Sequence, residues 1–343
     1  MINNRFNYSE RVIIVAEIGV NHEGDFSKAV WMIELAAQAG ADAVKFQTYI
    51  PELYISSSQM ERLERARRFN LSFEQFKQLV IEAKKKNVLF FSTPLDFKSL
   101  DLVNELSPVI KISSGDINNY PLLQRAAITG KIIILSTGLS TVEEIEKAIY
   151  IINKSNYSII PERKLILLHC IAAYPAPEEE VNLLSIPYLQ EKFAVPVGYS
   201  DHTKGILACQ IAVAIGACVI EKHFTYCKKN QTFHDHHLSA DPTEFREMVD
   251  NIRRIEKMRG IAEKRPMPSE LPFKSHIRRS LAAARDLNPE EILSERDICF
   301  LKPEKGIPIS GLGSVLGKRV KNKILKGKII SENDILNFDG NLC

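Results

Sequence analysis

Eight short apolar runs, each ending on polar residues, recur between residues 12 and 224 and alternate with amphipathic stretches of helical period. Runs of this kind are typical of strands buried on both faces of a parallel sheet. Eight strand-then-helix units within about 260 residues predict an α/β fold, the (β/α)8 or TIM barrel. The predicted strands span 12–17, 41–47, 88–93, 109–113, 132–137, 165–170, 195–200 and 218–224.

An open doubly wound sheet is the alternative, and it usually has a glycine-rich turn after its first strand. Here that turn reads IGVNHEGD, which is neither GxGxxG nor a P-loop, so the sequence favours the barrel. The second connection, 48–87, is longer than the others. It predicts an extra loop or short helix at the mouth of the barrel.

The composition changes after the eighth unit, where Pro266, Pro268 and Pro272 stop helices and favour an extended spacer. We therefore expect a barrel domain over 1–260, a proline-rich linker over 261–279 and a small β-rich domain over 280–343. Within the last domain, residues 287–298 and 324–335 align without gaps, which indicates internal pseudo-symmetry. A module this short is expected to lean on another surface.

Charge and hydropathy limit the classes of partner. Among 343 residues, 45 Lys and Arg balance 42 Asp and Glu, so the sequence predicts no nucleic-acid partner. Its apolar runs fall short of the roughly 18 residues that a membrane-spanning helix needs. The first ten residues, MINNRFNYSE, also lack a hydrophobic signal segment, so we expect a cytoplasmic protein that does not contact membranes.

Polar residues gather where the predicted strands end. In a (β/α)8 barrel the chemistry takes place at the carboxyl ends of the strands. A barrel with a purely structural role would not need charge at so many of these ends, so we predict a polar pocket there. The residues are Glu17, Lys45, Gln47, Ser92, Thr93, Lys111, Ser114, Asp116, Ser136, Thr137, His169, Ser200, Asp201, His202, Glu221 and His223.

Lys45 and Lys111 suggest what this pocket binds. Either lysine alone could reach solvent from the end of its strand. Both together, beside hydroxyl-rich STP, SSG and STG turns, favour a phosphate or carboxylate ligand, because lysines supply charge and hydroxyls supply directional hydrogen bonds.

Three further side chains carry candidate chemistry. His202 and His223 end neighbouring strands, so their imidazoles can meet and hold Mn²⁺, Mg²⁺, Zn²⁺ or Fe²⁺; a general base beside a structural histidine is the open alternative. Glu17 ends an apolar strand, and burial would raise its pKa and suit it to acid–base catalysis. The alternative role of Glu17 is an ion pair with Lys45 or Lys111. The histidines of 234–237 allow a second metal site, although a solvated loop is favoured.

Eight motifs follow one another along the predicted barrel: AEIGVNHEG (16–24), KFQTY (45–49), FSTPLDF (91–97), KISSGDINNYPL (111–122), LSTGL (135–139), HCIAAYPAP (169–177), VGYSDHT (197–203) and ACVIEKHFT (217–225). In this order they resemble the sialic acid synthase family, whose members make nonulosonic acids from phosphoenolpyruvate and a free amino sugar. The C-terminal segments RRSLAAA and GSVLGKRVKNKILKGKIISENDI resemble that family's antifreeze-like SAF domain, a β-clip fold.

The resemblance implies roles for individual residues. His202 and His223 stand where the family binds one Mn²⁺ or Mg²⁺, and with Glu17 they form the implied catalytic set. The implied phosphoenolpyruvate site is Lys45, Thr93, Lys111, Ser114, Ser136 and Ser200. The implied acceptor-sugar site is Gln47, Asp116, Tyr174, Asp235 and Lys302. The family is homodimeric, and each SAF domain caps the barrel of the partner.

The sequence departs from the family pattern on the sugar side. Asp116 stands where the family usually has Glu, and Lys302 stands where it usually has Arg, whose bidentate fork a lysine lacks. Phe233 and His234 replace the usual Gly-Pro before Asp235. The donor and metal sites are therefore better specified than the acceptor, which leaves N-acetylneuraminate, legionaminate and pseudaminate open as products.

Two other functions are compatible with the same residues. One is a pyruvate aldolase that uses Lys45 or Lys111 as a Schiff-base nucleophile. The other is a non-catalytic carbohydrate-binding or ice-binding protein in which the SAF-like module is the functional part and the barrel is a scaffold.

Overall fold

The computed structural model describes residues 6–229, 231, 233 and 235–338. The chain divides into two compact units, Met1–Gly260 and Ile261–Cys343. Each unit has its own hydrophobic core. In the part of the chain that the structure describes, no helix is long and apolar enough to cross a membrane.

The first unit is a closed barrel of parallel strands in sequential order, which confirms the predicted (β/α)8 fold. β8 pairs with β1 in parallel, with Val15 opposite Glu221 and Glu17 opposite His223, and this pairing closes the barrel. The strands are β1 (Ile13–Gly19), β2 (Ala43–Thr48), β3 (Leu89–Pro94), β4 (Val109–Ile112), β5 (Ile132–Ser136), β6 (Leu165–His169), β7 (Val197–Asp201) and β8 (Val219–His223).

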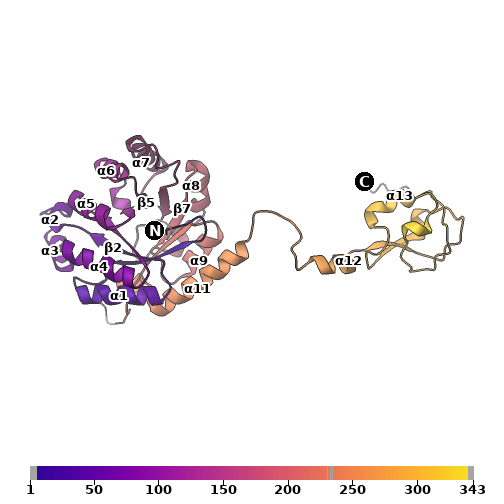
Figure 1. Cartoon of the computed structure of the whole chain (residues 1–343), viewed down its shortest axis with the longest axis horizontal. Helices are drawn as coiled ribbons and strands as arrows, with labels where there is room; N and C mark the ends of the chain where they lie inside the picture. The colour runs from indigo at the N-terminus through magenta and orange to yellow at the C-terminus, as the bar shows by residue number, and fades with distance from the viewer. Residues whose placement is uncertain (1–5, 230, 232, 234, 339–343) are drawn as a thin grey trace. The chain divides into compact units, whose positions relative to one another are not determined.

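Helices between successive strands surround the barrel (Figure 1). Capping boxes fix where several of them begin; for example, Ser72 accepts from the backbone of Gln75, whose side chain accepts in return from the backbone of Ser72. The surrounding helices are α1 (Phe26–Gln38), α4 (Phe73–Lys85), α5 (Phe97–Leu106), α6 (Tyr120–Ile128), α7 (Val142–Ser155), α8 (Ser185–Phe193), α9 (Leu207–Ala214) and α11 (Pro242–Arg259).

Within the described residues of this unit, three short helices and two 3-10 turns complete the fold. The long connection after β2 contains α2 (Pro51–Tyr54) and α3 (Met60–Phe69), in agreement with the extra element expected there. The third short helix is α10 (Asp235–Leu238), and the 3-10 turns are η1 (Ser114–Asp116) and η2 (Glu178–Glu180).

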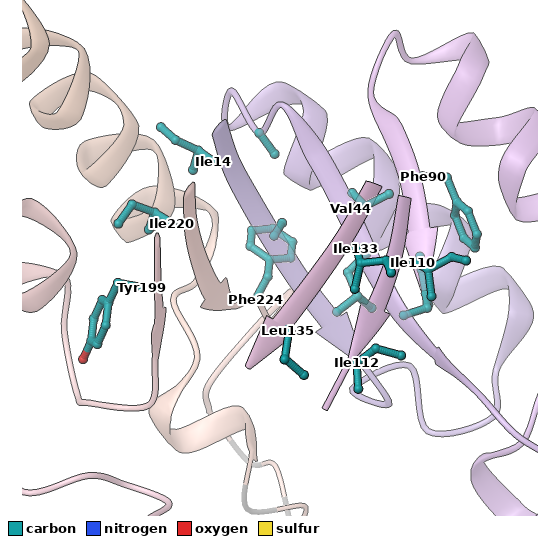
Figure 2. Packing of buried hydrophobic residues seen from close by; sticks show 14 of the residues in the cluster. Ile14, Val44, Phe90, Ile110, Ile112, Ile133, Leu135, Tyr199, Ile220 and Phe224 are labelled. Carbon is teal, nitrogen blue, oxygen red and sulfur yellow. The ribbon is translucent and has the colours of Figure 1, made fainter. Parts of the chain in front are cut away.

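Each strand alternates between two apolar layers, because successive side chains point to opposite faces. Ile14, Val44 and Phe90 belong to the layer between strands and helices, part of which Figure 2 shows. Their neighbours Ile13 and Ala43 belong to a smaller core with Leu89, Phe91, Val109, Ile134, Ile166, Leu168, Val219 and the N-terminal Phe6. This second core fills the interior of the barrel below the strand ends.

The second unit is small and β-rich. β9 (Ser280–Ala283) pairs antiparallel with β10 (Ile298–Leu301). The pseudo-repeat appears as two identical caps: Ser294 donates to Asp297 at the start of η4 (Glu295–Asp297), and Ser331 donates to Asp334 at the start of η6 (Glu332–Asp334). The remaining elements are α12 (Lys274–Ile277), α13 (Leu312–Val315), η3 (Leu271–Phe273) and η5 (Ile309–Gly311).

Gly198 in β7 leaves no room for a side chain. An added Cβ would lie 2.4 Å from the carbonyl oxygen of Val219 and 2.7 Å from Cδ2 of Leu168. Because the first of these atoms is backbone, Gly198→Ala must push β7 away from β8, and we expect it to lower the free energy of unfolding by about 1–3 kcal/mol.

Urea denaturation measures this loss. Gly313→Ala in α13 is the matched control, because an added methyl there meets nothing within 4 Å. Equal stability of the Gly198→Ala variant and the parent protein would contradict the packing described for β7 and β8.

Candidate active site

A cavity of about 380 Å³ lies at the carboxyl ends of the barrel strands. Its volume falls within the range of small-molecule sites. The structure brings most of the predicted site residues together around it: Glu17, Lys45, Gln47, Thr93, Lys111, Ser114, Ser136, Tyr174, Ser200, His202, His223 and Asp235.

Strand alternation explains which strand-end residues line the cavity. Glu17 and Lys45 lie two residues beyond Val15 and Ala43 of the interior core, so they continue the inward face. Lys111, Ser136, Glu221 and His223 follow the same rule on their own strands.

Apart from Asp116, four residues that the sequence analysis placed in the polar pocket do not line the cavity. Thr137 donates from Oγ1 to the carbonyl oxygen of Leu168 at 3.0 Å. His169 stacks on Tyr199 and its Nε2 lies 2.8 Å from the carbonyl oxygen of Val181. Ser92 lies 2.7 Å from the hydroxyl of Thr48, and Asp201 pairs with a lysine outside the cavity. Their position in the strand puts them one residue out of step with the inward face, so this part of the prediction is wrong.

Lys45 joins two buried carboxylates. Its Nζ lies 3.2 Å from Oε2 of Glu17, 3.3 Å from Oε1 of Glu221 and 3.3 Å from Oγ1 of Thr93. Burial raises the pKa of Glu17 to about 7 against the opposing effect of Lys45. Burial also disfavours the charge of Glu221, but Lys45 and Lys111 outweigh it and lower the pKa of that carboxyl. The two carboxyl groups of the cluster therefore differ in pKa, so that Glu17 can exchange a proton near neutral pH whereas Glu221 stays ionised.

Lys111 contributes the second buried ammonium group. Its Nζ donates to Oγ of Ser136 at 2.6 Å and to the carbonyl of Ile112 at 3.0 Å. Burial lowers the pKa of Lys111. Two lysines with hydroxyl groups at their sides form a cradle that suits a phosphate or carboxylate.

His202 and His223 face each other across the ends of β7 and β8. Their ring centroids are 5.4 Å apart, and Tyr174 stacks on His202 at 4.2 Å. His202 donates from Nδ1 to the carbonyl oxygen of Ile171 at 2.6 Å, so Nε2 carries the lone pair. Burial lowers the pKa of His202, which favours the neutral imidazole that a metal requires.

These residues fit a divalent cation that takes the rest of its ligands from substrate or water. Among the described residues no group of three His, Cys, Asp or Glu side chains could hold a metal ion by itself. Buried Oε2 of Glu221 in the same cavity has no hydrogen-bond partner within the described part of the chain, so it can still accept from a ligand or a bound water.

One predicted acceptor residue of the barrel unit does not line the cavity within the described residues. Asp116 accepts from Ser113 at 2.5 Å and from Asn119 at 3.4 Å, so its carboxylate holds the turn η1 together. Lys302 is exposed beside β10 in the second unit.

His236 differs from the expected residue of a solvated loop. His236 is fully buried, and its ring nitrogens lie 2.7 Å from Oγ1 of Thr225 and 3.2 Å from Oε1 of Glu23. These contacts occupy His236 inside the fold. His234, the other histidine of the alternative metal site, lies outside the described residues.

Sequence reasoning missed one wall of the cavity. α2 and α3 supply Tyr54, Arg62, Arg65 and Phe69 to the lining, and Tyr49 precedes them. The length of the connection signalled an extra element, but its basic run RLERARR gave no indication of facing the mouth. Glu221 was noted only as a strand end, and its pairing with Lys45 came from the structure.

A family model described as the NeuB family matches residues 32–264, more than half of the chain. The chain belongs to the NeuB family. A model described as the SAF domain matches residues 278–336. Together these matches confirm the resemblance to sialic acid synthases and the SAF-like C-terminal module.

Individual relatives cover nearly the whole chain. An uncharacterized protein of Methanocaldococcus jannaschii is 46% identical over 95% of this chain and 95% of its own length. The N,N'-diacetyllegionaminic acid synthase of Campylobacter jejuni is 39% identical over 94% of this chain and 100% of its own. A crystal structure of an N-acetylneuraminic acid synthetase from Leptospira borgpetersenii, in complex with citrate, is 40% identical with a TM-score of 0.72 and covers 76% of this chain and 90% of that one.

The raised pKa of Glu17 predicts a pH dependence of stability. Its pKa is about 7 in the folded protein against a reference value of 4.5, so between these pH values the folded state binds more protons than the unfolded state. This stabilising contribution is complete below about pH 4.5 and is lost as the pH rises through 7. We expect the parent protein to lose stability relative to Glu17→Gln over this window.

Urea denaturation at several pH values between 4.5 and 8 measures the difference. Glu247→Gln on the exposed side of α11 controls for the loss of one acidic group. A constant difference in unfolding free energy between the parent and Glu17→Gln across the window would contradict the raised pKa.

Proposed function

We propose that this protein is a nonulosonic acid synthase that condenses phosphoenolpyruvate with an N-acetylmannosamine-type amino sugar and releases phosphate. One observation carries the proposal: a cradle of two buried lysines and a pair of facing imidazoles share one cavity in a NeuB-family barrel. The first suits the anionic donor, and the second suits a metal-assisted carbonyl acceptor.

Donor binding is assigned to the lysine and hydroxyl groups of the cavity. Lys45 and Lys111 offset the negative charge of the enol phosphate and its carboxylate, while hydroxyls orient them through directional hydrogen bonds. The hydroxyl groups are those of Thr93, Ser114, Ser136 and Ser200. Fixing the donor in this way places its C3 for attack and removes much of the entropic cost of the reaction.

His202 and His223 would hold one Mn²⁺ or Mg²⁺. A cation bound there supplies Lewis-acid polarisation of the aldehyde oxygen of the open-chain sugar. The neutral state of His202 and its fixed Nδ1 bond prepare the ring for this role. Gln47, Tyr174 and Asp235 line the same cavity and are proposed to contact the sugar.

Glu17 is proposed to move the proton in the condensation. Attack by C3 on the aldehyde carbon forms the new C–C bond, breaks the π bond of the aldehyde and leaves positive charge at C2. Water adds to C2 and gives one proton to Glu17, which returns it to the former aldehyde oxygen to form a hydroxyl group. The C2–O bond to phosphate then breaks while the new C2 hydroxyl gives its proton to the departing phosphate, and a ketone forms. A pKa of about 7 lets Glu17 accept and return a proton near neutral pH.

The family resemblance supports two proposals about assembly. We propose a cytoplasmic homodimer in which the SAF unit of one chain covers the barrel mouth of the other. Lys302 of the partner subunit would then contact the acceptor sugar. An exposed Lys302 at the end of β10 is compatible with this role.

A Schiff-base aldolase is the second candidate. The lowered pKa of Lys111 favours it, because a lysine nucleophile must lose its proton before it attacks a carbonyl. Lys45 is less suited to that chemistry, since Glu17 and Glu221 raise its pKa despite burial. The third candidate, a carbohydrate-binding protein, would leave the charged barrel cavity without a role.

Product analysis tests the proposed reaction. We expect the protein with phosphoenolpyruvate, Mn²⁺ and at least one of a panel of 2-acetamido and 2,4-diacetamido hexoses to release phosphate and form the matching nonulosonate, detected by mass spectrometry. EDTA should abolish the reaction. Phosphate release with no member of the panel would refute the proposal, and a borohydride-trapped pyruvate adduct with EDTA-resistant activity would establish the aldolase instead.

Lys111 provides a test of donor binding alone. Removal of a buried ammonium that pairs with an anion costs about 2–5 kcal/mol, so Lys111→Met should weaken phosphoenolpyruvate binding by about 100-fold. Isothermal titration without acceptor measures the dissociation constant. Lys77→Met on the exposed surface of α4 should bind as the parent does. Unchanged affinity of the folded Lys111→Met variant would remove Lys111 from the donor site.

A further inference from the structure

A buried lysine outside the cavity bonds to both residues that flank His202. Lys222 donates from Nζ to Oδ2 of Asp201 at 2.7 Å and to the carbonyl oxygen of Thr203 at 2.6 Å. Lys222 also immediately precedes His223 in β8. The residue before His223 is therefore bonded to both neighbours of His202, to the carboxylate of Asp201 and to the backbone carbonyl of Thr203.

Asp201 is saturated with hydrogen bonds. Its Oδ1 accepts from the hydroxyl of Tyr199 at 3.0 Å and from the backbone N–H of Thr203 at 2.9 Å. Its Oδ2 accepts from Lys222 and from the thiol of Cys209 in α9 at 3.3 Å. None of the side-chain surface of Asp201 or Lys222 is exposed, so the pair lies wholly inside the layer between the barrel and α9.

A buried ion pair of this kind contributes little to the stability of the fold. Desolvation of two charges costs about as much as their attraction returns, and well-packed neutral residues of similar volume often serve a fold equally well. The pair does fix local geometry, because Oδ2 of Asp201 and the carbonyl oxygen of Thr203 are both held by the ammonium group of Lys222. Strand register adds to this, since Asp201 and Lys222 are paired across β7 and β8.

We propose that Lys222 and Asp201 form a clamp that sets the separation and orientation of the His202 and His223 imidazoles, and thereby the affinity for the divalent cation. The inference rests on the metal site of the proposed function. Lys222 and Asp201 act as positioning residues, because neither lines the cavity within the described part of the chain. Residues that orient metal-binding histidines commonly contribute about 10- to 100-fold to metal affinity.

Mn²⁺ binding to the full chain without substrates tests the clamp. The signal of free Mn²⁺ in electron paramagnetic resonance gives the dissociation constant for the parent, for Lys222→Met and for the double variant Asp201→Asn/Lys222→Met. The double variant removes both charges and keeps the volumes, so we expect it to fold with a melting temperature near that of the parent. We expect its Mn²⁺ affinity to fall by about 10- to 100-fold.

A second ion pair provides the matched control. Arg253 of α11 pairs with Asp42 at 2.6 Å, and Asp42 precedes β2 at the opposite end of the barrel. The double variant Asp42→Asn/Arg253→Met removes a partly buried pair far along the strands from the histidines. Its thermal stability is free to change, whereas its Mn²⁺ affinity should equal that of the parent.

The outcomes separate the clamp from the metal site itself. Loss of Mn²⁺ binding in His202→Ala together with parent-like binding in the folded clamp variant overturns the clamp and leaves the site intact. Parent protein that does not bind Mn²⁺, or binds it equally after His202→Ala, overturns the site and the clamp together. Failure of the double clamp variant to fold also overturns the clamp, since the pair would then serve the stability of the fold.

Discussion

The site depends on the two-residue alternation of side chains along eight parallel strands. Below the mouth, the inward face is apolar and includes Val15, Ala43 and Leu168. One step further along, the same face presents Glu17, Lys45 and Cys170 to the cavity. Closure of the barrel brings these positions from distant segments into a small volume above the apolar core.

Burial then decides the chemistry of the charged groups. Burial raises the pKa of Glu17 against the opposing effect of Lys45. Burial acts in the same direction on Glu221, but Lys45 and Lys111 outweigh it and lower the pKa of that carboxyl. The same burial favours neutral imidazole at His202. A second buried ion pair, Lys222 with Asp201, lies on the helix-facing side of β8 and β7. Its two residues directly precede His223 and His202 in the sequence.

Sequence alone predicted the barrel because its signals are local: apolar runs set the strands and capping boxes set the helix starts. Sequence reasoning placed too many residues in the pocket, because it did not separate the inward face of a strand from the outward one. Ser92, His169 and Asp201 lie near strand ends but point to the outward face. Sequence reasoning missed Arg62 and Arg65, because the position of α3 depends on how the inserted segment packs over the mouth. Sequence also could not separate Lys222 from an ordinary strand-end charge, since its partners are brought together only by the fold.

In the proposed function, one cavity holds an enol phosphate beside a cation. Crystals soaked with Mn²⁺ and phosphoenolpyruvate test this arrangement most directly, with anomalous scattering to locate the metal. We expect a manganese peak between His202 and His223 and phosphoenolpyruvate within hydrogen-bond distance of Lys45 and Lys111. Ligand density elsewhere, with the two imidazoles turned apart and no peak between them, would contradict it.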